Sequence, residues 1–257
     1  MTIQTIAKMT HKERIGRWDE KRADVLKFTR CLGWINIEAA SVLLDVTRPA
    51  ATRTLKGLAA DGLLHLHELS GMPKRIWFSI SETGMDEAFF LENLPLPSTV
   101  HAGRWKIAPQ NYQHEQDVLI FAVRAHKVGA EIRLAVPENG SGRALSGKYP
   151  DLLVEIGGQV FGIEIEREVK SRRRYREIIA SHWLAIERQQ YGRVFYLAPD
   201  QPTRDRLVRV VKSTFEGVRV GGRERALTAE ERKRFGFATY QQGFQYLYSI
   251  SGKENEK

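Results

Sequence analysis

Two short apolar segments joined by a pair of glycines constrain the fold of this chain more than any other feature. Apolar and less apolar residues alternate from Leu152 to Ile156, and the pattern resumes from Val160 to Ile165 after Gly157-Gly158. A period of two residues bounded by turn residues is typical of strands, and two glycines suit a tight hairpin turn. The sequence therefore predicts a β-hairpin over residues 152–165.

Three carboxylates lie in or beside this hairpin. Asp151 precedes the first strand, and Glu164 lies in the second at the position that a hairpin places beside it. Glu164 and Glu166 are two residues apart and therefore share one face of the strand. A buried carboxylate is normally paired or bound to a metal, and hard cations such as Mg²⁺ need only one or two carboxylates plus a substrate phosphate. We therefore expect these three acids to form a site for Mg²⁺ or Mn²⁺.

A dense run of positive charge follows the acids. It begins at Lys170 and includes four arginines of the next predicted helix, Arg172, Arg173, Arg174 and Arg176. Lysine and arginine neutralise the phosphates of nucleic acid, and a metal on the acidic side would polarise a phosphate and activate water. The combination favours metal-dependent cleavage of DNA. The alternative interpretation is an ordinary strand-to-helix junction followed by a solvated basic helix.

These residues resemble the PD-(D/E)xK phosphodiesterase fold, which many restriction enzymes share. The pattern differs at Glu166, which stands where the E-x-K motif has its lysine, and the nearest downstream lysine is Lys170. An E-x-E motif followed by a basic helix with a tyrosine resembles the replication-relaxation family, which includes the MobC-type relaxases of mobilisable plasmids. The matching residues are Asp151, Glu164, Glu166, Lys170 and Tyr175, together with a helix that opens at His114.

The resemblance covers about residues 20 to 215 and implies both a fold and a function. The implied fold is α/β (α+β overall), with an N-terminal winged helix-turn-helix followed by a restriction-endonuclease-like α/β domain. The implied function is nicking of DNA at the transfer origin of a plasmid or integrative element, together with relaxosome accessory proteins and a coupling protein. The resemblance also implies that Lys170 takes the role of the displaced lysine.

Each candidate residue receives a role in this hypothesis. Asp151 and Glu164 would hold the metal, Glu166 would ligate it or activate water, and Lys170 would stabilise the pentavalent phosphate. Related nuclease folds often place a further acid from the first helix near the metal, which makes Glu115 a secondary candidate ligand. The alternative for Glu115 is an acid that faces solvent at the start of a helix.

The residues before position 94 have the element order of a winged helix. The pattern predicts three helices, a hairpin and a fourth helix, over 19–32, 37–44, 47–61, 63–69 with 75–80, and 81–91. The third helix would be the recognition helix, capped by Thr47. The side chains expected to contact double-stranded DNA are Arg48, Thr52, Arg53 and Lys56 of this helix and Lys74 and Arg75 of the wing. The alternative is a winged helix that binds protein partners.

The expected domain organisation is a winged helix over 1–93, a linker over 94–109, a nuclease-like domain over 110–250 and a disordered tail over 251–257. In the second domain the pattern predicts a helix, three strands, a helix, a strand and a further helix that ends at 215. That order is typical of a restriction-nuclease core.

Composition agrees with a DNA-binding protein of the cytoplasm. The net charge of +9 and the pI of about 9.7 favour a nucleic-acid partner. A single cysteine, Cys31, excludes an intramolecular disulfide and a cysteine-based zinc site. No apolar run approaches the length of a membrane span, so we expect no membrane insertion. The rival hypothesis from another class is a non-catalytic DNA-binding regulator or replication accessory protein with a degenerate nuclease domain, which the departure at Glu166 favours.

Overall fold

The computed structural model describes residues 10–69, 72–95, 109–133, 149–220 and 223–252. The chain divides into two compact units, 1–109 and 110–257, and each is considered by itself. Most of the expected linker and the last five residues of the expected tail lie outside the described residues. Among the helices that are described, none has the length and apolar character needed to cross a membrane.

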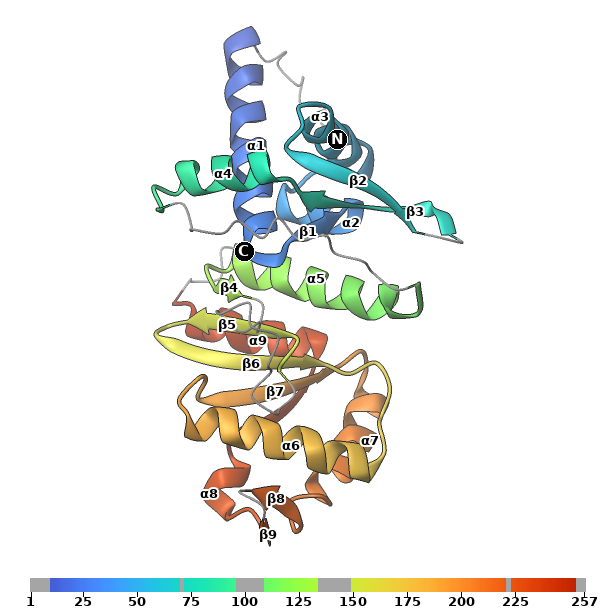
Figure 1. Cartoon of the computed structure of the whole chain (residues 1–257), viewed down its shortest axis with the longest axis vertical. Helices are drawn as coiled ribbons and strands as arrows, with labels where there is room; N and C mark the ends of the chain where they lie inside the picture. Colours follow the sequence, from blue (N-terminus) through green and yellow to red (C-terminus); the bar gives the residue numbers. More distant parts are fainter. Residues whose placement is uncertain (1–9, 70–71, 96–108, 134–148, 221–222, 253–257) are drawn as a thin grey trace, which may run out of the picture. The chain divides into compact units, whose positions relative to one another are not determined.

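Unit 1 contains the expected three helices, hairpin and fourth helix. In chain order these are α1 (His11–Leu32), α2 (Ile37–Leu43), α3 (Arg48–Ala60), β2 (Leu64–Leu69), β3 (Met72–Ile80) and α4 (Glu82–Leu91) (Figure 1). A short strand that the sequence pattern did not reveal, β1 (Trp34–Asn36), pairs antiparallel with β3 and gives the sheet order β1-β3-β2. Three residues are too few for a recognisable alternation, so β1 owes its conformation to its pairing with β3.

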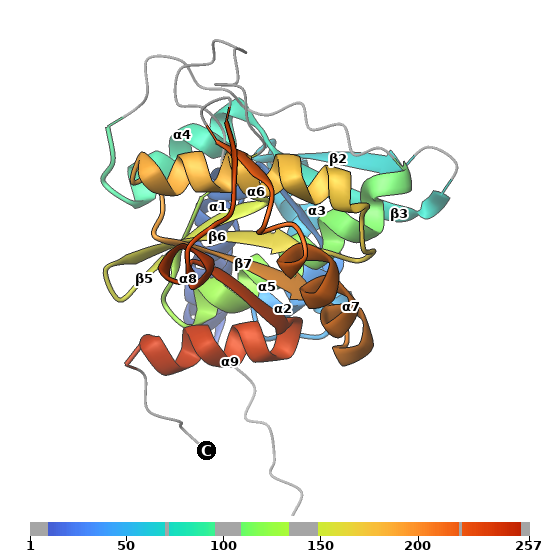
Figure 2. The same ribbon diagram turned by 90° about the horizontal axis from the view of Figure 1, so that it is seen from below.

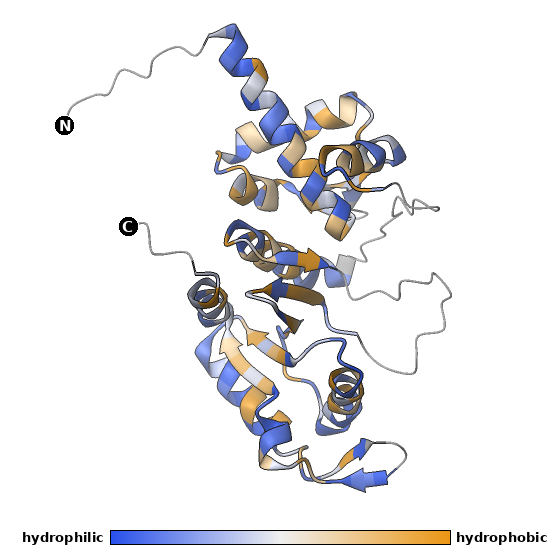
Figure 3. Ribbon diagram, turned by 90° about the vertical axis from the view of Figure 1, so that its left-hand side faces the viewer, coloured by the Kyte–Doolittle hydropathy of each residue, from blue (hydrophilic) through white to orange (hydrophobic). Residues whose placement is uncertain are grey.

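Helix α1 is longer than its sequence pattern indicated. We expected it to begin near Asp19, but it begins at His11, where Thr10 and Glu13 form a capping box. Its buried residues begin only at Val25, and residues 11–17 are exposed. This projecting end of α1 is coloured largely hydrophilic in Figure 3.

Unit 2 is built around a five-stranded mixed sheet with the order β10-β7-β6-β5-β4. Strands β4 (Glu131–Arg133), β5 (Leu152–Ile156) and β6 (Gln159–Ile165) form an antiparallel meander, and β7 (Arg193–Ala198) and β10 (Phe235–Thr239) run parallel to β6. Residues 134–136, which we expected to extend β4, lie outside the described part of the chain.

Helices cover both faces of this sheet. Helices α6 (Arg172–Glu187) and α7 (Gln201–Lys212) pack on one face, and α5 (Tyr112–Lys127) and α9 (Tyr240–Ile250) pack on the other (Figure 2). The core between α6, α7 and the sheet is rich in aromatic and aliphatic side chains, among them Tyr175, Ile178, Tyr196, Leu207 and Phe235. The result is a three-layer α/β/α arrangement.

The residues after 215 add more to unit 2 than the sequence pattern suggested. A small hairpin of β8 (Val218–Val220) and β9 (Arg223–Arg225) is followed by α8 (Ala229–Arg232). Strand β10 then becomes an edge of the main sheet, and α9 packs on it with Tyr246 against Phe161 and Phe195. Strand β10 contains a glycine and an alanine and no β-branched apolar residue, so its sequence lacked a clear strand signal.

Candidate functional site

The pairing of β5 with β6 places the backbones of the first two predicted acids side by side. Leu152 of β5 pairs with Ile163 of β6, so Asp151 and Glu164 occupy the next pair of positions in this antiparallel register. These positions lie at the end of the sheet that holds the C-terminal ends of β6 and β7. The Oδ2 atom of Asp151 accepts a hydrogen bond of 2.7 Å from the backbone N–H of Ile165. Asp151 is thereby fixed to the end of β6.

Glu164 is fully buried between β6 and α6. Its Oε1 atom lies 3.1 Å from His182 Nε2, and the two side chains are each 0% exposed. The other ring nitrogen of His182, Nδ1, lies 2.6 Å from the hydroxyl oxygen of Tyr191. A carboxylate, an imidazole and a phenol therefore form a continuous polar chain inside the protein.

Two further phenols lie beside the acids. Tyr196 is opposite Glu164 in the β6–β7 register, and burial together with the charges of Glu164 and Glu166 raises its pKa well above the ordinary value. Burial also raises the pKa of Tyr175, with a further contribution from Glu166, although its oxygen accepts a weak hydrogen bond of 3.3 Å from the backbone N–H of Lys170. Both phenols therefore remain protonated at neutral pH.

Glu166 and Lys170 form an ion pair just beyond the end of β6. The backbone N–H of Glu166 donates to the carbonyl of Leu197 at 2.8 Å and so extends the β6–β7 ladder by one residue. The Glu166 carboxylate is 1% exposed and contacts the Lys170 ammonium, which is itself partly exposed. The lysine that the sequence placed after the acids thus points toward them.

The first turn of α5 faces Asp151. His114 Nε2 lies 3.4 Å from Asp151 Oδ1, and this interaction raises the pKa of His114 against the opposing effect of burial. Burial raises the pKa of Glu115, and the charge of Asp151 adds to that shift. His114 is therefore the residue of this turn that contacts the acids directly, and Glu115 lies within their electrostatic field.

The chemistry of these side chains fits a hard divalent cation. Carboxylate oxygens are the ligands that Mg²⁺ and Mn²⁺ prefer, and Asp151 and Glu164 occupy neighbouring strands at one level. Over the described residues, no three His, Cys, Asp or Glu side chains gather closely enough to enclose a metal on their own. Two carboxylates with a substrate phosphate are a common way of holding Mg²⁺, so Asp151 and Glu164 would be its protein ligands.

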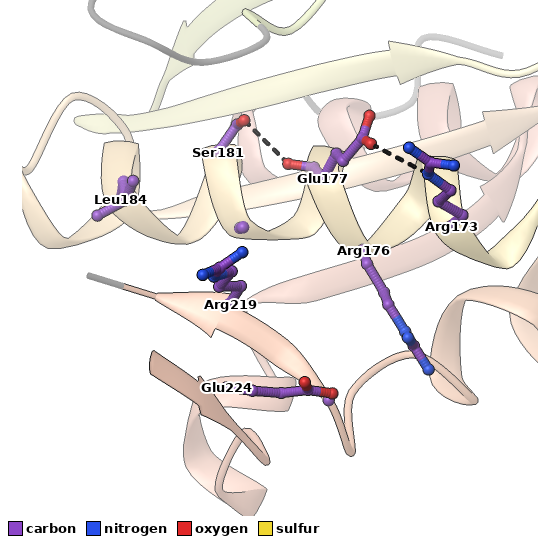
Figure 4. A pocket seen from close by; sticks show the side chains of 9 residues that line it. Arg173, Arg176, Glu177, Ser181, Leu184, Arg219 and Glu224 are labelled. Atoms are coloured by element: carbon purple, nitrogen blue, oxygen red, sulfur yellow. Dashed lines mark hydrogen bonds and ion pairs between the residues drawn. The ribbon is translucent and has the colours of Figure 1, made fainter. Parts of the chain in front are cut away.

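The arginines of α6 point outward, opposite to its buried face. Tyr175 faces the core, whereas the side chains of Arg172, Arg173, Arg174 and Arg176 are exposed. Arg173 and Arg176 line a pocket of about 400 Å³, together with Arg219 of β8 and Glu224 of β9 (Figure 4). Glu177 also lines it and pairs with Arg174 at 3.0 Å, so the pocket combines positive and negative groups.

The cations predicted on α3 are exposed as well. Arg48, Arg53 and Lys56 are accessible, and Arg48 pairs with Glu38 of α2 at 2.7 Å. Thr52 is half-buried, and its hydroxyl donates to the carbonyl of Arg48 at 2.8 Å. The side chains of Lys74 and Arg75 lie outside the described residues, although their backbone belongs to β3.

His182 contacts Glu164, Tyr191 contacts His182, and His114 contacts Asp151, although none of the three was predicted to hold the acids. A signal for His182 was present, because it lies seven residues, or about two helical turns, after Tyr175 on the buried face of α6. Tyr191 follows the end of α6, and no local pattern connects it to His182. Comparison of the chain with protein-family models, characterised proteins and solved structures gave no match.

Proposed function

We propose that this protein is a metal-dependent endonuclease that nicks double-stranded DNA. The proposal rests above all on the juxtaposition of Asp151 and Glu164 at the end of the β5–β6 hairpin, with Lys170 directed at the neighbouring Glu166. Acids on adjacent strand ends with a lysine beside them are the groups that hydrolysis of a phosphodiester requires.

The order of elements supports a PD-(D/E)xK domain as the setting of this chemistry. Unit 2 runs α5, β4, β5, β6, α6 and β7, with an antiparallel meander followed by a parallel strand. Unit 1, with three helices and then an antiparallel hairpin, supports a winged helix-turn-helix. Helix α3 would then enter the major groove and present Arg53 and Lys56 to the DNA.

The side chains of the site divide the work of phosphodiester hydrolysis. A divalent cation bound by Asp151 and Glu164 would supply Lewis-acid activation of the phosphate and of a water molecule. Lys170 would stabilise the negative charge that develops on the phosphate, and Glu166 holds its ammonium in position. His182, which lies against the Glu164 carboxylate, would restrict its orientation.

Water is the nucleophile that fits this site best. The raised pKa of Tyr175 and its burial disfavour a phenolate, so the proposal needs no covalent tyrosyl intermediate. Action at a transfer origin, with relaxosome accessory proteins and a coupling protein, remains a prediction from the resemblance to MobC-type relaxases.

A second candidate function is a DNA-binding regulator whose nuclease-like unit serves as a scaffold. It is favoured by the ion pairs that the acids already make inside the protein, above all the contact of Glu164 with His182 at 0% exposure. In that case both units would bind DNA, and no divalent ion would elicit cleavage.

Conversion of supercoiled plasmid to open circles distinguishes the two functions. We expect the wild-type protein to nick in Mg²⁺ or Mn²⁺, and Asp151→Ala or Glu164→Ala to lower the rate by about 10²-fold or more while DNA binding persists. The matched control is Glu155→Ala, which removes an exposed carboxylate of β5 that pairs with Arg133. Binding without nicking by the wild type under both ions would favour the regulator.

A further inference from the structure

The first two turns of α1 extend beyond the rest of unit 1 (Figures 1 and 3). Residues 11–17 are all exposed, and even Ile15 is 49% exposed. Most helices in proteins are stabilised by packing of an apolar face, and a helix end that is exposed on all sides lacks that support. Two turns of helix are thus held out into solvent, where a partner can reach them.

At the base of this exposed segment, Trp18 packs on α3. The indole ring of Trp18 lies on Gly57 of α3, where a Cβ atom on Gly57 would stand only 2.7 Å from Trp18 Cη2. The absence of a side chain at position 57 lets the two helices approach closely at this point. The projecting half of α1 therefore begins beside α3, the helix that we expect to contact DNA.

Positive side chains from both helices gather around this contact. Arg17 and Lys21 lie one residue before and three residues after Trp18, and so flank it on one side of α1. Partial burial lowers the pKa of Lys21, and the positive charges of Arg17 and of Arg53 on α3 lower it further. Lys21 and Arg53 form no ion pair with any residue that the structure describes. Like charges held this close repel one another, and a polyanion would relieve that repulsion.

We infer that the N-terminal half of α1 is a second DNA-contacting element, in which Arg17 and Lys21 bind backbone phosphates next to those contacted by Arg53. The inference rests on the proposed DNA binding and extends it to a helix outside the recognition helix. Contacts with phosphates fix the position of a protein on the duplex without reading its sequence. The role of α1 is therefore to orient α3 on the DNA and to strengthen binding to every sequence.

The positive charge of Arg17 and Lys21 favours DNA as the partner of this face of α1 over a second copy of this chain. Self-association about a two-fold axis through Arg17 and Lys21 would bring these residues against the same two residues of the other copy. Pairing of like charges opposes such a dimer, whereas a phosphate backbone complements them.

The salt dependence of DNA binding tests the inference. The variant Arg17→Gln/Lys21→Gln is compared with wild type by fluorescence anisotropy over a series of KCl concentrations. Two lost phosphate contacts, at about 0.9 each, should reduce the slope of log K against log[KCl] by about 1.8 for a B-DNA duplex of about 30 base pairs. The control Lys12→Gln/Lys27→Gln removes the same charge from the other side of α1 and should change the slope by less than half as much.

Each alternative result has a separate meaning. If wild type binds DNA and the Arg17/Lys21 variant keeps the wild-type slope, the inference is overturned while the proposed function stands. If wild type fails to bind duplex DNA at any salt concentration, both are overturned. If light scattering shows a wild-type dimer that the variant dissociates, with the slope unchanged, the surface belongs to a second copy of the chain and the inference fails.

Discussion

Glu164 is the residue whose environment says most about the site. A carboxylate with no exposed surface is costly to desolvate, and contact with one imidazole rarely offsets the whole cost. Buried leucine-like side chains at both positions would fill the same space without that cost. Stability alone therefore does not account for this buried pair, whereas the metal-binding role proposed for Glu164 would.

Removal of His182 should be strongly destabilising. We expect His182→Ala to lower the free energy of unfolding of unit 2 by about 3–5 kcal/mol, because the variant leaves a buried carboxylate without its imidazole partner. Hydrogen exchange of the β6 and β7 amides reports this quantity separately from the stability of unit 1. The double variant Glu164→Leu/His182→Leu should recover most of the loss. A cost below about 1 kcal/mol for His182→Ala would show that Glu164 does not depend on this contact.

Lys170 is expected to replace the lysine that the E-x-K motif places two residues after the glutamate. Lys170→Ala should therefore lower the nicking rate by about 10²–10³-fold, the usual effect of losing one group that stabilises transition-state charge. Glu166→Lys combined with Lys170→Ala moves the amine to the usual motif position and should recover part of the rate. Plasmid nicking measures both variants. Full activity of Lys170→Ala would remove this lysine from the mechanism.

At the scale of elements, α6 connects the two sets of residues on which the proposal depends. Its inner face carries Tyr175 and His182 toward the acids, and its outer face carries the arginines that line the pocket with β8 and β9. The helix begins directly after the segment that holds Lys170, with Ser171 as its N-cap. A shift of α6 would therefore move the partner of Glu164 and the basic surface together.

Periodicity explains which elements were predictable from the sequence. The hairpin over 152–165 and the helices α3, α5 and α6 have long or regular patterns, and the structure contains each of them. Strand β1, strand β10 and helix α9 were not predicted. Strand β1 has only three residues, and β10 contains a glycine and an alanine and no β-branched apolar residue. The aromatic residues of α9 could be assigned to a buried face only once the sheet was known. The start of α1 was missed because its first two turns bury nothing.

The same reasoning applies to the site. Hairpin geometry alone places the backbone of Asp151 beside that of Glu164, so this register followed from the sequence. The contact of Glu164 with His182 depends on how α6 is rotated and shifted against β6, and the contact of Asp151 with His114 depends on the packing of α5. No pattern within one element encodes these placements. Sequence reasoning therefore found the acids and missed the side chains that hold them.

At the scale of the whole molecule, the net charge of +9 is divided between two units that we expect to do different work. Unit 1 presents exposed cations on α3, and unit 2 presents acids at the end of a sheet beside a basic helix. If unit 1 binds DNA and unit 2 cleaves it, substitutions in the two units should change different kinetic constants. Loss of a contact that holds the DNA equally in the ground state and the transition state raises KM, whereas loss of transition-state stabilisation lowers kcat.

The variant Arg53→Gln/Lys56→Gln should therefore raise the DNA concentration needed for half-maximal nicking by about ten- to a hundredfold, the effect of two lost charge-assisted contacts, and leave kcat unchanged. Asp151→Ala should do the reverse, with lower kcat and nearly unchanged binding. Steady-state nicking over a range of plasmid concentrations measures both quantities, and Arg206→Gln/Arg209→Gln on the exposed side of α7 serves as the matched charge control. An equal fall of kcat in the α3 variant would mean that DNA held by α3 completes the catalytic site, and the division of labour between the units would have to be abandoned.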